Sequence, residues 1–410
     1  MRTYVIVGAG ARGRHMFAGP LFAEWADFAR LAGVYDLNRH RAELLSRECG
    51  GIPVFPDMDE MLKATKPDVV IVATIDSMHD YYIIRALEAG CDVISEKPLT
   101  INAGKLQAIL EAERRTGRQV TVTFNARFMP YMAGIKKLLK EGVVGRVLGV
   151  NLEWHLDRVH GADYFRRWHR HMDNSGGLLV HKSTHHFDLV NWWLDAEPVE
   201  VSAMGELGFY GPKREERGER CQGCSYRNRC EFYFDIAKDA FNASYYRDAE
   251  AEDGYYRDQC VFSDDTSIYD TMSLGVQYDS KAILTYSLTA YSPYEGWKLV
   301  IHGVDGRLEA EQFYSGGRTG EPYSEIAIYH RDGEIALHRI PVSGGSHSGG
   351  DERLRSMLFG EAIPDPLGQQ AGTRAGALSM LIGAAANISI AERRPVTIGE
   401  LMGGGQSIER

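Results

Sequence analysis

Near its start the sequence reads Thr3-Tyr4-Val5-Ile6-Val7-Gly8-Ala9-Gly10-Ala11-Arg12-Gly13, an apolar run followed at once by glycines spaced G-x-G-x-x-G. The apolar run is typical of a strand buried on both faces, and the glycines predict a tight turn into a helix. Gly8 permits the turn, Gly10 lets the backbone approach a pyrophosphate, and Gly13 lets helix and strand pack closely. Backbone N–H groups, as at Ala11 and Arg12, would then face the phosphates. The stretch therefore predicts a dinucleotide-binding fold.

The rest of the first 124 residues continues this pattern. Further apolar runs lie at 31–36, 68–73, 92–95 and 119–124. Between them are segments of helical character, such as 77–89 and 102–116. Strands that alternate with helices indicate a doubly wound parallel sheet. We therefore expect an α/β protein whose residues 1–124 form a Rossmann domain.

Three side chains are candidates for the cofactor edge of this domain. Asp36 ends the second strand, where a carboxylate accepts hydrogen bonds from the ribose hydroxyls and disfavours a 2′-phosphate, so NAD is favoured over NADP. Arg39 is close enough in the sequence to leave NADP open. Thr74 ends the third strand, and His79 lies just beyond it. The alternative for His79 is a solvent-facing position at the start of a helix.

The triplet Glu96-Lys97-Pro98 follows the fourth strand. In a parallel sheet the carboxyl ends of the strands face the bound cofactor, so both Glu96 and Lys97 are expected at the cofactor edge. A lysine beside a nicotinamide is a candidate acid/base group. We therefore place Lys97 among the catalytic residues.

The pattern changes after about residue 125. Helices are expected at 128–140 and 177–194, followed by strands with period-two alternation at 199–208, 266–277, 281–291, 296–303, 307–312, 324–330 and 334–340. Short turns between successive strands indicate a large, mostly antiparallel open sheet. Two late helices, near 350–360 and 371–392, should return toward the Rossmann domain. We therefore expect a second, α+β domain at 125–410 for substrate binding and oligomerisation, with a homodimer or homotetramer built sheet against sheet.

Residues 211–262 lack clear periodicity and resemble an insertion rich in charge, tyrosine and cysteine. Its cysteines form a C-x-x-C knuckle followed by two more, at Cys221, Cys224, Cys230 and Cys260. This spacing fits a structural zinc site that would order a segment without a core of its own. Free thiols, an iron–sulfur cluster or a disulfide are the alternatives.

Residues 176–188 read Gly-Gly-Leu-Leu-Val-His-Lys-Ser-Thr-His-His-Phe-Asp. On one continuous helix, His181, His185 and Asp188 would share a face. Histidine suits proton transfer near neutral pH, and two histidines four residues apart also fit a zinc pair. The remaining interpretation is a packed helix whose histidines are satisfied internally.

Taken together, these motifs resemble the Gfo/Idh/MocA family, which includes glucose–fructose oxidoreductase and inositol dehydrogenase. The resemblance extends over the whole chain and includes Asn125-Ala126-Arg127-Phe128 after the last Rossmann strand. It places Lys97 on the lysine that bridges cofactor and substrate, His185 on the catalytic histidine, and Asp188 on a later aspartate. Two positions depart from the family pattern: His181 stands where many members have aspartate, and Ser183 replaces glycine.

Aromatic and basic residues gather before and within this segment and suit a sugar or an acidic sugar. The predicted substrate contacts are Arg127, Trp154, Trp168, Lys182 and Asp188. The loop Ser346–Asp351 either lines the substrate pocket or begins a helix with Asp351 near its cap.

The resemblance implies an NAD-dependent oxidoreductase acting on a hydroxyl of a sugar, sugar acid or polyol, with Lys97, His185 and His181 as catalytic residues. The departure at His181 motivates an alternative, a redox-assisted glycosidase or lyase that oxidises a sugar transiently, eliminates a substituent and reduces the ring again. A non-catalytic sensor of NAD and sugar is a third hypothesis, which the presence of both Lys97 and His185 disfavours.

Composition excludes other classes of protein. The net charge of −10 disfavours a nucleic-acid partner. A membrane-spanning helix needs an apolar run of roughly 18 residues, and we expect no such run in this sequence. Six cysteines in 410 residues do not indicate a disulfide scaffold, so we expect a reducing, cytoplasmic environment.

Overall fold

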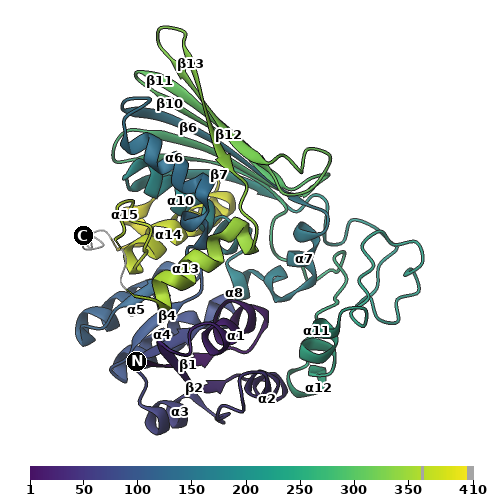
Figure 1. Cartoon of the computed structure of the whole chain (residues 1–410). Helices are drawn as coiled ribbons and strands as arrows, with labels where there is room; N and C mark the ends of the chain where they lie inside the picture. Colours follow the sequence, from purple (N-terminus) through teal and green to yellow (C-terminus); the bar gives the residue numbers. More distant parts are fainter. Residues whose placement is uncertain (362–363, 404–410) are drawn as a thin grey trace.

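The computed structural model describes residues 1–361 and 364–403 and contains two β-sheets. One has five strands in the order β2-β1-β3-β4-β5, and the other has nine in the order β13-β12-β11-β10-β6-β9-β8-β7-β14. Figure 1 shows the small sheet in the lower part of the molecule and the large one above it. The predicted α/β fold with a second, mostly antiparallel sheet is confirmed. The boundaries drawn at 124/125 and 410 stay predictions, and 362–363 and 404–410 lie outside the described residues.

The five-stranded sheet is parallel throughout. Its strands are β1 (Arg2–Val7), β2 (Ala29–Tyr35), β3 (Val69–Val72), β4 (Asp92–Ser95) and β5 (Val120–Val122). The helical elements between them are η1 (Gly13–Ala18), α1 (Gly19–Ala23), α2 (Arg39–Glu48), α3 (Met58–Thr65), η2 (Asp76–Met78), α4 (His79–Glu88) and α5 (Ala103–Thr116). Because the chain moves from β1 outward to β2 and then back to β3, the strand order switches between β1 and β3. Ligands of such sheets bind at the carboxyl ends of the strands at this point.

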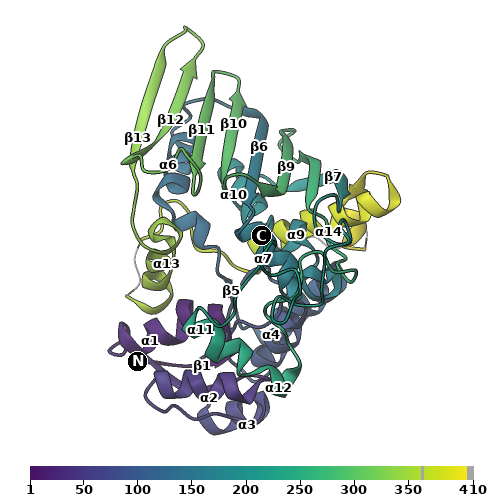
Figure 2. The same ribbon diagram turned by 90° about the vertical axis from the view of Figure 1, so that its right-hand side faces the viewer.

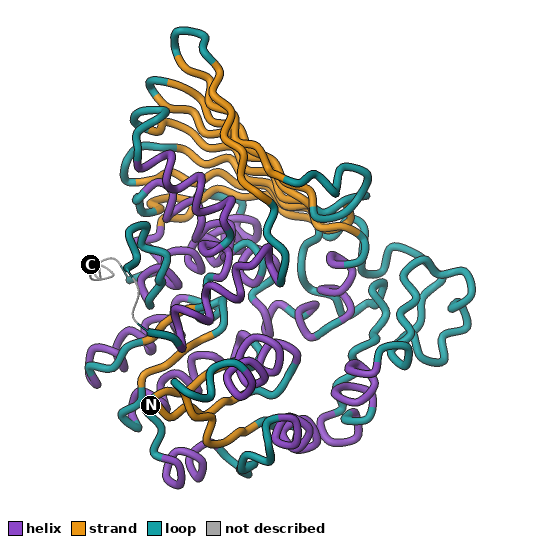
Figure 3. Tube along the Cα trace, in the orientation of Figure 1, coloured by secondary structure: helices purple, strands orange, loops and turns teal. Residues whose placement is uncertain are grey.

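The nine-stranded sheet has one covered and one open face. Its strands are β6 (Val147–Asp157), β7 (Pro198–Glu206), β8 (Thr271–Tyr278), β9 (Ile283–Ser292), β10 (Gly296–Gly303), β11 (Gly306–Phe313), β12 (Tyr323–His330), β13 (Ile335–Pro341) and β14 (Val396–Thr397). Figures 1 and 3 show α6 (Pro130–Lys140), α10 (Thr184–Leu194) and α14 (Thr373–Glu392) on one side of it. On the other side, side chains such as Met204, Ile283 and Leu337 are exposed.

Strand β6 is a central element that our sequence analysis did not predict. It pairs with β10 on one side and, in parallel, with β9 on the other. Its inward residues alternate with outward ones and are Val150, Leu152, Trp154 and Leu156. This alternation is readable in the sequence. The central place of β6 between two strands from much later in the chain is a tertiary feature.

The single helix predicted over 177–194 is wrong. The structure has a short helix α9 (Leu178–His181), a break at Lys182 and Ser183, and then α10. At the break the N–H of Ser183 donates to the carbonyl of Leu178, so the regular four-residue repeat is lost. His181 and His185 therefore do not lie on one continuous helical face, as the i, i+4 argument assumed.

Helix α14 also corrects an expectation, because it is long and apolar enough to cross a membrane by length and composition. Most of its apolar window is buried within the protein, where it packs on α10 and β7. A core helix passes the same test of length and hydropathy, and the burial of α14 identifies it as one.

The other helical elements all follow the first sheet in the sequence. They are η3 (Asn125–Phe128), α7 (His160–Arg166), η4 (Trp168–Arg170), α8 (Met172–Ser175), η6 (Ser346–Gly349), α13 (Gly350–Phe359) and α15 (Ile398–Leu401). Helix α13 packs on η1 and η3, next to the first sheet. The long excursion between β7 and β8 contains α11 (Ala240–Asn242), η5 (Ala243–Arg247) and α12 (Glu250–Asp253), which lie beside α2 in Figures 1 and 2.

Candidate active site

The glycine-rich turn lies at the switch point between β1 and β3. Gly8 has a φ of +103°, and a Cβ there would lie 2.4 Å from the carbonyl oxygen of Ala73. A Cβ on Gly13 would lie 2.1 Å from the carbonyl oxygen of Gly8. Both positions therefore need glycine for the strand, turn and helix to pack together. The turn brings Gly8 next to the backbone of Thr74, just beyond the end of β3.

Asp36 faces this turn from the end of β2. Its carboxylate accepts hydrogen bonds from the backbone N–H of Ala9, at 2.6 Å, and of Asn38, at 2.7 Å. The side chain is nearly buried, and desolvation raises its pKa although Arg41 and these N–H groups act against this. The predicted contact of Asp36 with ribose hydroxyls stays a prediction.

Lys97 lies against His181, and His181 against Asp76. The ammonium Nζ of Lys97 donates to the carbonyl oxygen of His181 at 3.0 Å and lies 3.5 Å from Nε2 of the same residue. On the other side of the ring, Nδ1 of His181 lies 2.5 Å from Oδ2 of Asp76. Asp76 begins η2, after β3, and is 2% exposed. Sequence analysis missed it, although an acid just beyond a strand end in this sheet could have been flagged by the argument used for Lys97.

Burial controls the protonation of this cluster. Desolvation raises the pKa of Asp76 and lowers the pKa of His181, whose charging the nearby Lys97 also opposes. Both shifts favour the uncharged forms, and the 2.5 Å contact between Nδ1 of His181 and Oδ2 of Asp76 is a hydrogen bond. Desolvation lowers the pKa of Lys97 to about 8, while Asp76 and Glu96 act to raise it. Asp76 thus places a carboxyl group against the histidine at position 181.

His185 has a ring nitrogen without a hydrogen-bond partner. Its Nδ1 is buried and has no hydrogen-bond partner among the described residues. Desolvation, followed by the charges of Lys97 and Lys182, holds its pKa well below the usual range, so the imidazole is neutral at pH 7. A neutral histidine with a free nitrogen beside a charged lysine can act as a general base.

Aromatic rings and further unpartnered donors surround these groups. Trp154 stacks on His186 with ring centroids 3.7 Å apart, and the ammonium of Lys182 lies 5.7 Å from the Trp154 ring. Trp168 stacks on His169 and meets the edge of His181. Buried nitrogens without a partner in the described part of the chain include Trp154 Nε1, His169 Nδ1 and His186 Nε2. These groups could accept a polyhydroxylated ligand.

Comparison with known proteins identifies the family of this chain. Residues 2–124 match the family model described as "Oxidoreductase family, NAD-binding Rossmann fold", and residues 136–398 match its "C-terminal alpha/beta domain". The chain belongs to the Gfo/Idh/MocA oxidoreductase family. Like other members, it is an oxidoreductase with an NAD-binding Rossmann domain.

Three relatives show the range of this Gfo/Idh/MocA likeness. The Bacillus subtilis protein named "Putative oxidoreductase YteT" is 38% identical over 98% of this chain and 99% of its own. The B. subtilis scyllo-inositol 2-dehydrogenase (NAD(+)) is 30% identical over 48% of this chain and 56% of its own. A levoglucosan dehydrogenase, solved with NADH and levoglucosan, superposes with a TM-score of 0.67 at 18% identity over 97% of this chain and 99% of its own, which shows a shared fold.

Several predicted site residues of this Gfo/Idh/MocA chain have roles other than those expected. His79 is fully buried rather than at the cofactor surface or in solvent, and its Nδ1–H donates to the carbonyl of Pro98 at 2.7 Å. It thereby fixes the backbone next to Lys97. Arg12 binds Glu96 at 2.6 Å and Asp351 at 3.0 Å, so the side chains of Arg12 and Glu96 link the cofactor turn to α13. The Ser346–Asp351 loop is anchored here through Asp351.

Arg127 and Asp188 bind each other in the interior of the protein. This pairing corrects their assignment as substrate contacts. Nε and Nη2 of Arg127 donate to the two carboxylate oxygens of Asp188 at 2.7 and 2.6 Å, and Nη1 donates to the carbonyl of Gly368. The side chains are 7% and 1% exposed. A buried bidentate pair of this kind joins η3 to α10.

The zinc predictions are also wrong. No group of three or more histidine, cysteine or acidic side chains in 1–361 and 364–403 could hold a metal ion. The four cysteines of the insertion line one small cavity, but the thiol of Cys221 is taken by Arg166, whose Nη1 donates to it at 3.2 Å. Nε2 of His181 lies 3.5 Å from the ammonium of Lys97, a cation that opposes a metal ion at this nitrogen.

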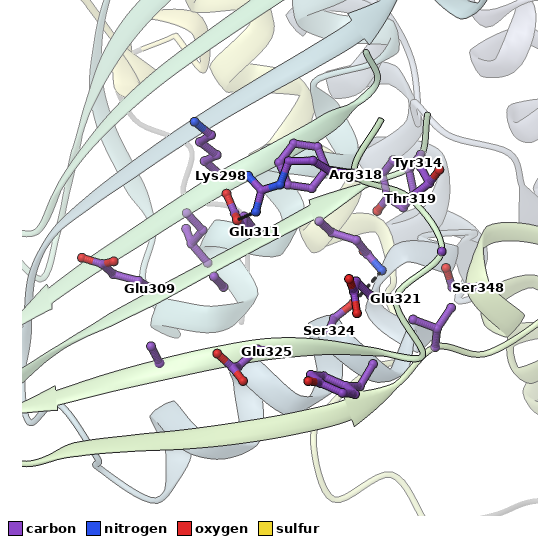
Figure 4. A pocket seen from close by; sticks show the side chains of 18 of the residues that line it. Lys298, Glu309, Glu311, Tyr314, Arg318, Thr319, Glu321, Ser324, Glu325 and Ser348 are labelled. Carbon is purple, nitrogen blue, oxygen red and sulfur yellow. Dashed lines mark hydrogen bonds and ion pairs between the residues drawn. The ribbon is translucent and has the colours of Figure 1, made fainter. Parts of the chain in front are cut away.

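A cavity of about 910 Å³ lies away from this chemistry, on the open face of the nine-stranded sheet. Figure 4 shows its polar side chains, among them Lys298 from β10, Glu309 and Glu311 from β11, and Arg318 from the loop between β11 and β12. It contains none of the predicted catalytic or cofactor residues.

Proposed function

We propose that this chain is an NAD-dependent dehydrogenase that oxidises a hydroxyl group of a sugar, sugar acid or polyol. One observation carries the proposal: Lys97 is held by His181 and Asp76 next to the cofactor turn, near an unpartnered neutral His185. The names of relatives, scyllo-inositol 2-dehydrogenase and levoglucosan dehydrogenase, support this class of substrate.

The residues fit the cofactor that the family implies. The turn at Gly8 and Gly13 has no room for side chains, and Asp36 stands at the ribose side of it. NAD, when bound, supplies the hydride acceptor, and the electron pair of the carbinol C–H bond leaves with that hydride. The roles of the protein are to hold the hydroxyl, receive its proton and stabilise the charge on its oxygen.

His185 and Lys97 divide these roles. The neutral His185 takes the hydroxyl proton on its free nitrogen, and the ammonium of Lys97 stabilises the alkoxide that develops as the proton leaves. His181 and Asp76 are positioning residues, since His181 makes two contacts with Lys97 and Asp76 in turn holds the ring of His181. Trp154, Trp168 and Lys182 are suited to contact the rest of the sugar.

The test is proton NMR in deuterium oxide with NAD and a panel of sugars, sugar acids, polyols and simple glycosides. A keto product formed in step with NADH is expected. Glycoside cleavage with deuterium at one ring carbon and no build-up of NADH would instead establish the redox-assisted glycosidase or lyase. In that reaction the imidazoles of His169 and His181, whose pKa values are lowered by burial, would serve as the additional acid and base. Binding of NAD without turnover of any compound would establish the sensor.

Lys97→Ala should reduce kcat/KM by about 10²- to 10⁴-fold, because the alkoxide loses its cation. Lys105→Ala removes the same charge from a lysine that pairs with Asp80, and it should leave turnover near normal. Equal rates for the two variants would contradict the role of Lys97.

We also propose that the protein is a cytoplasmic homodimer or homotetramer that pairs through the open sheet face. The exposed apolar side chains on that face support the assembly, and the six free cysteines support a reducing compartment. Sedimentation at micromolar concentration should show a dimer or tetramer, and a monomer alone would contradict the assembly.

A further inference from the structure

The excursion between β7 and β8 is fixed against the ribose side of the cofactor cradle. The side chain of Asn38 donates to the carbonyl of Ala249 at 2.9 Å, and the backbone N–H of His40 donates to Glu252 at 2.9 Å. The hydroxyl of Tyr246 accepts the N–H of Ala11, in the glycine turn, at 3.0 Å. Residues 243–253 therefore border the part of the site that lies at Asp36 and the start of α2.

The cation nearest to Asp36 is Arg41, not Arg39. Arg39 is largely exposed and pairs with Glu43 on its own helix. Arg41 lies 3.6 Å from Asp36, and its side chain is only 12% exposed. An arginine near the ribose acid is the kind of residue that binds the 2′-phosphate of NADP. The position of Arg41 would therefore favour NADP if its guanidinium were free.

The guanidinium of Arg41 is not free, because Asp253 at the end of α12 binds its Nη2. Asp253 is 12% exposed and also accepts the backbone N–H of Tyr255 at 3.1 Å, so its place is fixed. Arg41 thus faces two carboxylates, Asp36 and Asp253. A 2′-phosphate entering here would meet an excess of negative charge.

We propose that Asp253 is a determinant of cofactor specificity, which occupies Arg41 and so prevents it from binding the 2′-phosphate of NADP. The inference rests on the proposed NAD cofactor. It assigns to the insertion a role in the Rossmann site, from a residue more than 200 positions beyond Arg41.

The test measures the dissociation constants of NAD and NADP by tryptophan fluorescence without any substrate. Asp253→Asn keeps the shape and the bond to Tyr255 but removes the charge, and it should lower the Kd ratio of NADP to NAD by about tenfold or more. Glu252→Gln is the matched control. Glu252 is the neighbour of Asp253, and its carboxylate accepts the backbone N–H of His40, so Glu252→Gln removes the same charge at the next position. This variant should change the Kd ratio of NADP to NAD by less than about threefold.

The double variant Asp253→Asn with Arg41→Met should lose the gain, because the freed cation is gone. A ratio that changes less than threefold in Asp253→Asn, an equal change in Glu252→Gln, or a gain that survives in the double variant would overturn the proposal. If thermal unfolding shows that Asp253→Asn does not fold, Asp253→Ser replaces it with the same expectation. Native protein that binds both nucleotides equally well would refute this inference alone, whereas native protein that binds neither would refute the proposed function.

Discussion

Replacing Asp76 by asparagine tests the arrangement of Lys97, His181 and Asp76 most directly. Asparagine is nearly isosteric and can still accept the hydrogen bond from Nδ1 of His181, but it carries no charge. Because Asp76 acts to raise the pKa of Lys97, its neutralisation should lower that pKa further below its present value of about 8. The ammonium would then lose its proton at a lower pH, and the alkoxide would lose its stabilising cation there.

The size of the effect follows from the contacts through the imidazole. Lys97 Nζ lies 3.5 Å from Nε2 of His181, whose Nδ1 lies 2.5 Å from Asp76. With the width of the ring, the two charges are at most about 8 Å apart, which at an effective dielectric constant of about 20 corresponds to about 2 kcal/mol. The pKa of Lys97 should therefore fall by about 1.5.

The assay is kcat/KM for NADH formation as a function of pH, which reports ionisations of the free enzyme. In the native protein, activity should decline as pH rises through about 8, and in Asp76→Asn the same decline should begin about 1.5 pH units lower. Asp80→Asn is the control, since it removes an acid nearby in the sequence whose partner is Lys105. An unshifted profile in Asp76→Asn, or an equal shift in Asp80→Asn, would refute the reasoning.

Three further predictions concern other parts of the molecule. His185→Ala should reduce kcat by about 10²- to 10⁴-fold with little change in the Kd of NAD, and loss of NAD binding instead would show a structural role. Asp188→Ala should lower the free energy of unfolding in urea by about 3–5 kcal/mol, because it leaves the Arg127 charge buried and unpaired. Glu141→Ala breaks the exposed pair with Lys137 and should cost less than about 0.5 kcal/mol, so similar losses in both variants would contradict the assignment. Treatment with a chelator should shift Tm by less than about 2 °C, since the described residues contain no group arranged to hold a metal, and a larger shift would restore the zinc hypothesis.

The sequence was sufficient wherever short-range chemistry controls the structure. The strand before Gly8 and the turn after it were predictable, because only glycine fits the close contacts with Ala73 and between Gly13 and Gly8. Lys97 was predictable as a functional residue because parallel strands bring their carboxyl ends to one edge. The strands of the second sheet were mostly predictable from alternation with period two, since one of its faces is buried and the other is open.

Contacts between distant segments were decided only by the tertiary structure. The histidine at position 181 looked unsupported in the sequence, but the fold brings Asp76 from the other domain to within 2.5 Å of its ring. Arg127 and Asp188 looked like free polar groups, but they satisfy each other in the interior. The insertion looked like a separate segment without a core of its own, but it packs against α2 and brings Asp253 to Arg41. Local spacing in the sequence does not specify which side chains meet across the chain. Packing decides this, and a buried ionisable group takes its protonation state and its role from the group that packing places beside it.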